Sequence, residues 1–112
     1  MNVPSHTARL ALAGAIASMV RDVAPYNVTV NSVLPGLINT GALRDALHDS
    51  AAERGDTYEA LEEEVLAGTA AGRLAEPYEV GDLIAMLRSA QLGCITAQNI
   101  VSDGGAYTGL FS

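Results

Sequence analysis

Apolar residues dominate the first part of the chain. Residues 8–20 include only two strongly polar side chains, Arg9 and Ser18. This pattern predicts a helix over Pro4–Ala24, because the residue before Pro25 is pushed out of the α region. A helix that is apolar on every face needs to be covered on every face. Two interpretations stay open: it is the core helix of a larger monomer, or it forms a subunit interface.

A short strand is predicted directly after this helix. Val28–Leu34 is rich in branched apolar residues, which suit a sheet that is covered on both faces. Asn31 interrupts the run, and it is expected to hydrogen-bond a neighbouring loop rather than to act in catalysis. Pro35 cannot donate to the ladder and therefore ends the strand. In an open α/β sheet ligands bind beyond the carboxyl ends of the strands, so chemistry is expected after the turn at Pro35-Gly36.

The rest of the chain alternates between helical and extended patterns. Residues 42–67 predict two short helices that are broken at Gly55-Asp56, with Thr57 as the N-cap of the second. A last helix is expected over 77–93, and a second strand over Asn99–Ser102. The order helix, strand, two short helices, helix, strand predicts an α/β fold.

Composition and charge narrow the class of protein. The 112 residues form one domain at most, and 49% of them are hydrophobic, which excludes a disordered chain. The formal net charge of −7 argues against a nucleic-acid partner, and the acidic stretch 45–64 is expected to be a solvated helical face. No apolar run is long enough to span a bilayer, so no membrane partner is expected. The lone Cys94 is expected to be a small buried residue, and its lack of a partner fits a cytoplasmic location.

Few side chains suggest metal or acid–base chemistry. His48 lies in the acidic helical stretch, where a solvated histidine is more common than a general acid or base. His6 has no cysteine or carboxylate at ligand spacing, so no metal site is expected. Thr40 has two interpretations: it caps the helix that follows, or its hydroxyl meets an anion at the start of that helix.

Four stretches of the chain carry a resemblance to a known family. They are residues 5–9, 28–36, 72–77 and 98–105. In order and spacing they resemble the Tyr-x-x-x-Lys helix, the sixth strand with its Pro-Gly turn, the lead-in to the last long helix, and the last strand of the short-chain dehydrogenase/reductase family. The resemblance implies that residues 1–112 are a partial Rossmann-type domain. This domain would be the C-terminal half of a doubly wound parallel sheet, without the N-terminal dinucleotide-binding half.

The resemblance also implies a cofactor and the residues that meet it. In the family the backbone after the Pro-Gly turn contacts the nicotinamide amide, and here that backbone belongs to Pro35, Gly36, Leu37 and Ile38. A threonine near this point contacts the cofactor phosphates in the family, and Thr40 stands at that position. NAD or NADP is therefore the expected cofactor if the missing half is supplied.

The catalytic positions depart from the family pattern. Ser5 stands where the family has its catalytic tyrosine, and Arg9 stands where it has the lysine. A serine hydroxyl is far less acidic than a phenol, whereas the planar guanidinium of Arg9 can still hold a ribose or phosphate. The expected function is the C-terminal segment of an NAD(P)-dependent reductase of carbonyl or alcohol substrates, of the 3-oxoacyl type, inactive as the isolated chain. The alternative is a non-catalytic oligomerisation or ligand-binding module derived from the same fold.

The predicted sheet fragment also needs a partner. A two-stranded parallel pair is marginal alone, and the strand over 28–34 would leave an apolar edge unpaired. On the first helix Gly14 lies among alanines, which would let a second helix approach closely. The family pairs this helix across a subunit boundary. We therefore expect a homo-oligomer or a complementary chain, bound through helix 5–24 and the edge of strand 28–34.

Overall fold

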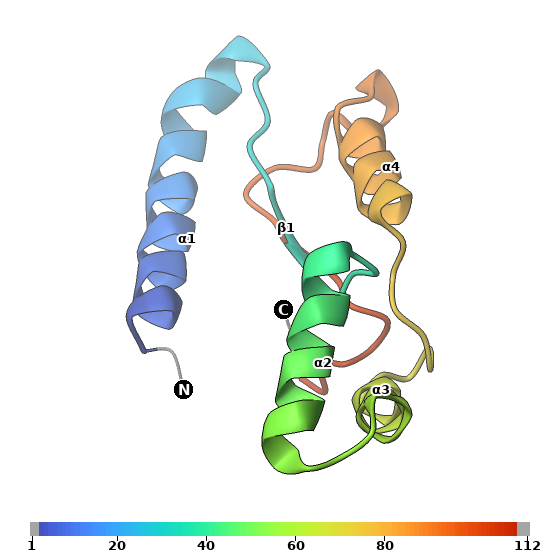
Figure 1. Ribbon diagram of the computed structural model, residues 1–112. Helices are drawn as coiled ribbons and strands as arrows, with labels where there is room; N and C mark the ends of the chain where they lie inside the picture. The colour runs from blue at the N-terminus through green and yellow to red at the C-terminus, as the bar shows by residue number, and fades with distance from the viewer. Residues whose placement is uncertain (1–2, 110–112) are drawn as a thin grey trace. The chain divides into compact units, whose positions relative to one another are not determined.

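The computed structural model describes the backbone of residues 3–109 and the side chains of residues 7–109. The described residues form the predicted order of helices and strands, with two short 3₁₀ helices in addition, and this confirms the α/β class (Figure 1). In chain order the elements are α1 (Val3–Val23), η1 (Ala24–Tyr26), β1 (Ser32–Pro35), α2 (Gly41–Arg54), α3 (Tyr58–Ala67), α4 (Pro77–Leu87), η2 (Ala90–Leu92) and β2 (Asn99–Ser102).

The described chain divides into two compact units. The first contains the residues up to Val33 together with Ile84–Ile100, and the second contains Leu34–Leu83 together with the residues from Val101 onward. The first unit therefore holds α1 and η1, and the second holds the α2–α3 region and the turn that follows β1. Each unit is described by itself below.

The two strands pair in parallel, as predicted. The N–H of Ser32 donates to the carbonyl of Gln98 at 2.9 Å, and the N–H of Gly36 donates to the carbonyl of Ser102 at 3.0 Å. The separation in sequence is the same for both bonds, so the register does not slip along the pair. β2 has the predicted bounds, and Pro35 ends β1 as expected. The prediction that β1 starts at Val28 was wrong.

One backbone bond and several side-chain bonds, rather than a regular ladder, hold the stretch before β1, the backbone bond being from the N–H of Ala97 to the carbonyl of Val30 at 2.8 Å. The side-chain amide of Asn31 donates to the carbonyl of Ile95 at 2.9 Å and its oxygen accepts from the N–H of Gln98 at 3.1 Å. The hydroxyl of Thr96 accepts from the N–H of Val30 at 3.1 Å. These bonds replace the ladder that would have extended the strand. They also confirm that Asn31 is the hydrogen-bonding partner of a neighbouring loop.

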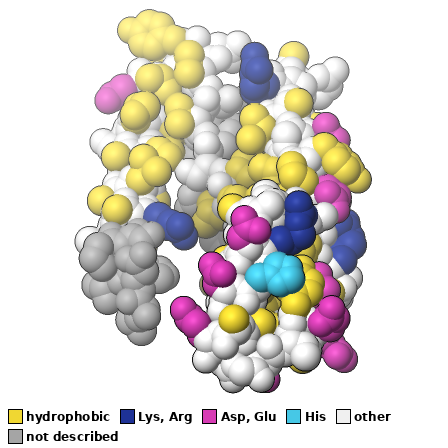
Figure 2. Space-filling view, viewed as in Figure 1, with side chains coloured by type: hydrophobic (Ala, Val, Ile, Leu, Met, Phe, Trp, Pro, Cys, Tyr) yellow, Lys and Arg dark blue, Asp and Glu magenta, His cyan; other side chains and the backbone are white. Residues whose placement is uncertain are grey.

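α1 is apolar and largely exposed. Among its described side chains only Val20 is buried, whereas Leu10 is 75% exposed and Leu12 is 60% exposed. Hydrophobic side chains line the visible face of α1 in the left part of Figure 2. The helix ends before Pro25, as predicted, and the chain continues into η1. None of the described helices is long and apolar enough to cross a membrane. The cover that such a helix needs does not come from the described residues.

α2 and α3 form a helical hairpin that holds the core of the second unit (Figure 1). The two helices are separated where predicted, since Gly55 adopts a left-handed conformation with φ 71° and ends α2. The hydroxyl of Thr57 accepts from the N–H of Ala60 at 3.2 Å, which confirms Thr57 as the N-cap of α3. The buried residues are Leu47, Ala51 and Leu61, with Leu43, Tyr58 and Val65 packed against them.

Acidic side chains gather over the outer surface of this hairpin, as Figure 2 shows. Arg54 bridges its two helices, with 2.9 Å between Nη2 and the Oε2 atom of Glu64, and it also pairs with Asp56 at 3.2 Å. Both pairs are exposed, so each contributes little to stability. The acidic stretch is therefore a solvated face, in agreement with the prediction.

Two predictions for the last third of the chain were wrong. α4 ends at Leu87 rather than at Gly93, because the hydroxyl of Ser89 donates to the carbonyl of Met86 and offers the backbone an alternative to the helix. The chain then continues into η2. Cys94 is exposed rather than buried, since it lies in the turn after η2 and not on a helix face.

Candidate functional site

The turn after β1 is held by a close backbone contact that only glycine permits. A Cβ atom on Gly36 would lie 2.7 Å from Cβ and 2.8 Å from Cα of Asp103. The carboxylate of Asp103 in turn accepts from the N–H groups of Gly105 and Tyr107, at 2.9 and 2.8 Å. The Asp-Gly-Gly turn that follows β2 therefore packs directly against the Pro-Gly turn that follows β1.

The segment after this turn forms an isolated parallel bridge with the approach to α4. The N–H of Asn39 donates to the carbonyl of Ala75 at 2.8 Å, and the N–H of Ala75 donates to the carbonyl of Leu37 at 3.2 Å. Both bonds flank Ile38, whose own N–H and C=O face the opposite edge. Neither group of Ile38 has a hydrogen-bond partner within the described residues. The backbone of Ile38, with its N–H in one peptide group and its C=O in the next, therefore offers one donor and one acceptor on the same edge.

Thr40 follows directly and begins α2. Its hydroxyl oxygen accepts from the N–H of Leu43 at 3.2 Å, which confirms the N-cap interpretation. A capping hydroxyl still carries a hydrogen that it can donate, and the first N–H groups of a helix attract an anion. The cap and the anion contact are thus compatible with each other.

A network of charged and amide side chains supports the same segment. Arg73 pairs with Glu79 through two bonds of 2.8 Å each, and the N–H of Glu76 donates to Oε2 of Glu79 at 2.8 Å. These contacts hold the pKa of the Glu79 carboxyl at about 2, well below its usual range, the Arg73 guanidinium being the larger cause. Glu76 then accepts from the side chain of Asn39 at 3.0 Å, and Asn39 accepts from Arg44.

Replacing Glu79 with glutamine is expected to lower the stability of the protein near neutral pH, and the loss should shrink in acid. The pKa of Glu79 is lower in the folded state than its ordinary value of 4.5. Its stabilising contribution is therefore fully present above that ordinary value and is lost as the pH falls through the folded value. Thermal unfolding of both proteins across this range measures the difference.

Glu63→Gln is the matched control, because Glu63 is an exposed carboxylate on α3. The lowered pKa of Glu79 would be contradicted if Glu79→Gln and the unsubstituted protein differed in stability by the same amount from neutral pH down to below that pKa.

The other predicted site residues lie elsewhere. Arg9 is exposed on α1, in the first unit, and has no ion pair or hydrogen bond within the described residues. The side chain of Ser5 lies outside the described residues. The second unit thus contains Pro35, Gly36, Leu37, Ile38 and Thr40, whereas Arg9 belongs to the first unit.

His48 stacks on the ring of Tyr58, with the ring centroids 4.2 Å apart. The Tyr58 hydroxyl donates to Glu62 at 3.3 Å, and burial together with that carboxylate raises the pKa of Tyr58. The stack holds the exposed His48 side chain of α2 against α3. The described residues contain no group of three or more side chains that could hold a metal ion.

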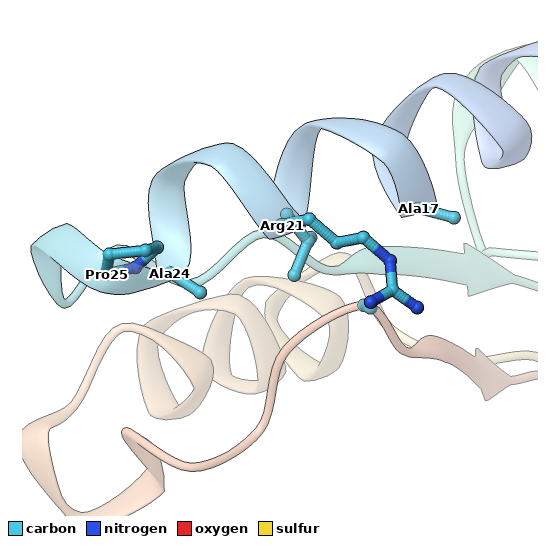
Figure 3. Close-up of a pocket in the computed structure, with 6 residues that line it drawn as sticks. Ala17, Arg21, Ala24 and Pro25 are labelled. Carbon is cyan, nitrogen blue, oxygen red and sulfur yellow. The ribbon is translucent and has the colours of Figure 1, made fainter.

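An open hollow of about 440 Å³ lies in the first unit, beside the end of α1. The Arg21 side chain extends from α1 toward the chain that leads into β2 (Figure 3). The lining is otherwise apolar, and consists of Ala17, Val20, Ala24, Pro25 and Ala97. This hollow contains none of the residues that the sequence predicted for a site.

Sequence patterns missed the residues that hold the site. Glu76 and Asp103 lie in stretches that carry the family resemblance, but their contacts with Asn39 and Gly36 join positions far apart in the chain. The one available signal was the start of α4, where Glu79 stands three residues after Glu76, as in a capping box.

Comparisons of the sequence with known proteins identify related reductases. Residues 2–107 match the family described as Enoyl-(Acyl carrier protein) reductase. Over 100 residues the chain is 37% identical to the 3-oxoacyl-[acyl-carrier-protein] reductase FabG of Vibrio cholerae, an alignment that covers 89% of this chain and 36% of that protein. The corresponding identity with FabG of Escherichia coli K12 is 33%, with the same coverage. The chain therefore spans little more than a third of the length of these relatives.

Solved structures share the arrangement of elements. A short chain dehydrogenase family protein from Francisella tularensis superposes with a TM-score of 0.78 at 28% identity, over 86% of this chain and 40% of that one. YwfH, an NADPH dependent reductase involved in bacilysin biosynthesis, superposes with a TM-score of 0.80 at 29% identity, over 90% of this chain and 38% of that one.

Proposed function

The chain belongs to the short-chain dehydrogenase/reductase family, and we propose that it is the C-terminal, substrate-side part of an NAD(P)-dependent reductase that acts on a carbonyl group. The names of the FabG relatives support a 3-oxoacyl substrate, and the name of YwfH supports a nicotinamide cofactor. Because the alignments cover little more than a third of the relatives, the rest of the active site would come from sequence that this chain does not contain.

The open peptide of Ile38 carries the proposal. A carboxamide has one acceptor and one pair of donors, so it can bond the N–H and the C=O of Ile38 at the same time. The neighbouring Leu37 is 45% exposed, which leaves an apolar side chain available beside a flat ring. The residues after the Pro-Gly turn therefore fit the nicotinamide end of the cofactor, which supplies the hydride when it is bound.

Thr40 would bind a phosphate of the nicotinamide half of the cofactor. Its hydroxyl hydrogen and the first N–H groups of α2 would donate to a phosphate, while the hydroxyl oxygen keeps its bond to Leu43. The segment Leu37–Thr40 would thus orient the ring through backbone groups and neutralise the phosphate at a helix start. The proposal leaves the choice between NAD and NADP open, because the described segment meets only the part that both share.

Replacing Thr40 with aspartate separates the cap from the phosphate contact. Aspartate is a good N-cap, so the melting temperature should stay close to that of the unsubstituted protein. The added negative charge should weaken binding of NADPH by about tenfold, as a repulsion of about 1.4 kcal/mol would do. Titration by nicotinamide fluorescence measures the affinity.

Thr57→Asp is the control, because Thr57 caps α3 with the same geometry and the same 3.2 Å bond. Equal affinity for NADPH in both variants would contradict the role of Thr40. A lack of NADH and NADPH binding by the unsubstituted protein would contradict the proposed function itself.

At the catalytic positions, we propose a cofactor-binding role for Arg9 and no proton transfer by Ser5. The guanidinium of Arg9 is exposed and would contact the ribose or a phosphate through its planar fork. Ser5 cannot exchange a proton near neutral pH as a tyrosine phenol can. We therefore expect the protein to bind the cofactor without reducing a ketone or aldehyde by itself.

A second candidate function, an assembly module, is favoured by the exposure of α1. The exposed fraction is 75% for Leu10, 60% for Leu12 and 47% for Met19. The small residues around Gly14 permit the close approach of another helix. The occupant that fits best is a second copy of this chain, because an identical apolar helix is self-complementary across a two-fold axis. β1 pairs only with β2 among the described residues, so the other edge of β1 would join the same assembly.

Leu12→Glu tests this assembly. A charge on the exposed face of α1 is expected to convert oligomers to monomers in sedimentation velocity experiments, because an unpaired carboxylate is costly to bury. Met86→Glu is the control, since Met86 is equally exposed, at 60%, but lies on α4. A monodisperse monomer in the unsubstituted protein would contradict the proposal. An oligomer that Leu12→Glu leaves intact would place the interface elsewhere, on a complementary surface.

A further inference from the structure

Asn39 lies at the centre of the network that borders the open peptide. Its backbone N–H donates to the carbonyl of Ala75 at 2.8 Å, as one of the two bonds that flank Ile38. Its side-chain Nδ2 donates to Oε1 of Glu76 at 3.0 Å. Its side-chain Oδ1 accepts from Nη1 of Arg44. One residue thus ties the segment after β1 to the N-terminal turns of both α2 and α4.

The side-chain amide of Asn39 satisfies both of these contacts at once. Glu76 presents an acceptor and Arg44 presents a donor, so the side chain between them must donate on one side and accept on the other. An aspartate could accept from Arg44, but it would place a second carboxylate against Glu76. An alanine would leave both partners without their bond. The amide at position 39 therefore matches its two neighbours in polarity as well as in position.

The neighbour on the α4 side is itself held firmly. Glu76 directly precedes α4, and its N–H donates to Glu79 at 2.8 Å. Glu79 is held by the two bonds from Arg73. The chain of contacts runs from Arg73 through Glu79 and Glu76 to Asn39. A displacement of the Glu76 carboxylate would therefore be transmitted to the peptide beside Asn39.

We propose that Asn39 is a positioning residue, whose side-chain amide holds the Ile38 peptide in the orientation that presents its N–H and C=O to the nicotinamide carboxamide. This inference rests on the proposed function. Asn39 does not touch the cofactor in this proposal, and it acts through the peptide that precedes it. Through Arg44 the same amide couples the start of the α2–α3 hairpin to the nicotinamide-binding segment.

Four variants of the protein test the inference. They are Asn39→Asp, Glu76→Gln, the double variant Asn39→Asp/Glu76→Gln, and Asn99→Asp as the matched control at an exposed position of β2. In the double variant the glutamine donates to the aspartate, so the contact between positions 39 and 76 is restored with its polarity reversed. A titration with NADH, followed through the amide signal of Ile38 in a ¹H–¹⁵N NMR spectrum, measures the affinity even when it is weak.

We expect Asn39→Asp to raise the Kd for NADH by about tenfold, Glu76→Gln to change it little, and the double variant to return it near the original value. Asn99→Asp should leave the Kd unchanged. The rescue is the critical result, since it shows that the loss of affinity arises at the contact between positions 39 and 76. A measurement well below the melting temperature of each variant keeps affinity separate from stability.

Two results would overturn the inference, and they are distinguishable. The positioning role of Asn39 is wrong if the unsubstituted protein binds NADH and Asn39→Asp binds it equally well. It is also wrong if the double variant binds NADH no better than Asn39→Asp. In both cases the proposed function stands. If the unsubstituted protein shows no change at the Ile38 amide with NADH or NADPH, the proposed function fails and the inference fails with it.

Discussion

Gly36→Ala is expected to destabilise the protein by about 2 to 3 kcal/mol, because the added methyl group has no space. Its Cβ would lie 2.7 Å from Cβ and 2.8 Å from Cα of Asp103, closer than carbon atoms approach in proteins. One of the neighbouring atoms is backbone, so relief requires the two turns to separate rather than a side chain to rotate. Urea unfolding followed by circular dichroism measures the loss.

Gly41→Ala is the matched control for this substitution. A Cβ at Gly41 would meet no atom within 4 Å, and Gly41 is the first residue of α2, where alanine is at least as favourable as glycine. This variant should be as stable as the unsubstituted protein or more so. If Gly36→Ala were equally stable, the contact between the Pro-Gly and Asp-Gly-Gly turns would not exist in solution.

The same substitution should also impair the nicotinamide site. The N–H of Gly36 donates to the carbonyl of Ser102, and the bridge at Ile38 begins only two residues later. Separation of the two turns would therefore move the peptide that we propose to bind the carboxamide. Glycine is required here for close approach of two backbones and not for a left-handed conformation.

Leu61→Ala is expected to cost about 2 to 4 kcal/mol, the range for a leucine truncated in a core. Leu61 is 5% exposed and lies between α2 and α3, against Leu47 and Ala51. The described core contains few buried side chains, so Leu61 supplies a large share of its buried apolar surface. Because the whole stability of a small domain is only about 5 to 15 kcal/mol, this loss would be a large fraction of it.

Met86→Ala serves as the control for Leu61→Ala, because Met86 is apolar and of similar size but 60% exposed on α4. Its truncation should change stability by less than about 0.5 kcal/mol. Thermal unfolding of both variants at low protein concentration gives the comparison. Similar losses in the two variants would show that the α2–α3 hairpin does not hold the core.

Local signals were sufficient for most of the helix and strand boundaries. Pro25 marks the end of α1, Gly55 marks the break between α2 and α3, and Thr57 marks the start of α3. Each signal acts on its own neighbours through a lost donor, a left-handed conformation or a capping hydroxyl. The same reasoning failed at Val28 and at Gly93, where the hydroxyl of Thr96 and the hydroxyl of Ser89 took the backbone away from the expected bonds.

The candidate site was only partly visible in the sequence. The Pro-Gly turn and Thr40 stood in the resemblance to the family, and the cap at Thr40 followed from its local position. Asn39 could not be recognised, since its partner Glu76 lies 37 residues further along the chain. The unpaired N–H and C=O of Ile38 could not be recognised either. They depend on Ala75, which bonds the C=O of Leu37 and the N–H of Asn39 on the opposite edge.

By itself the sequence determined the order of helices and strands, the caps and the place of the turn where a ligand is expected, because backbone sterics and short-range hydrogen bonds set these features. Only the tertiary structure decided that Gly36 must lack a side chain, that the side chain of Asn39 donates to Glu76 and accepts from Arg44, and that the backbone N–H and C=O of Ile38 point away from Ala75. These features depend on atoms brought into contact by folding from distant parts of the chain, and no local pattern encodes such contacts.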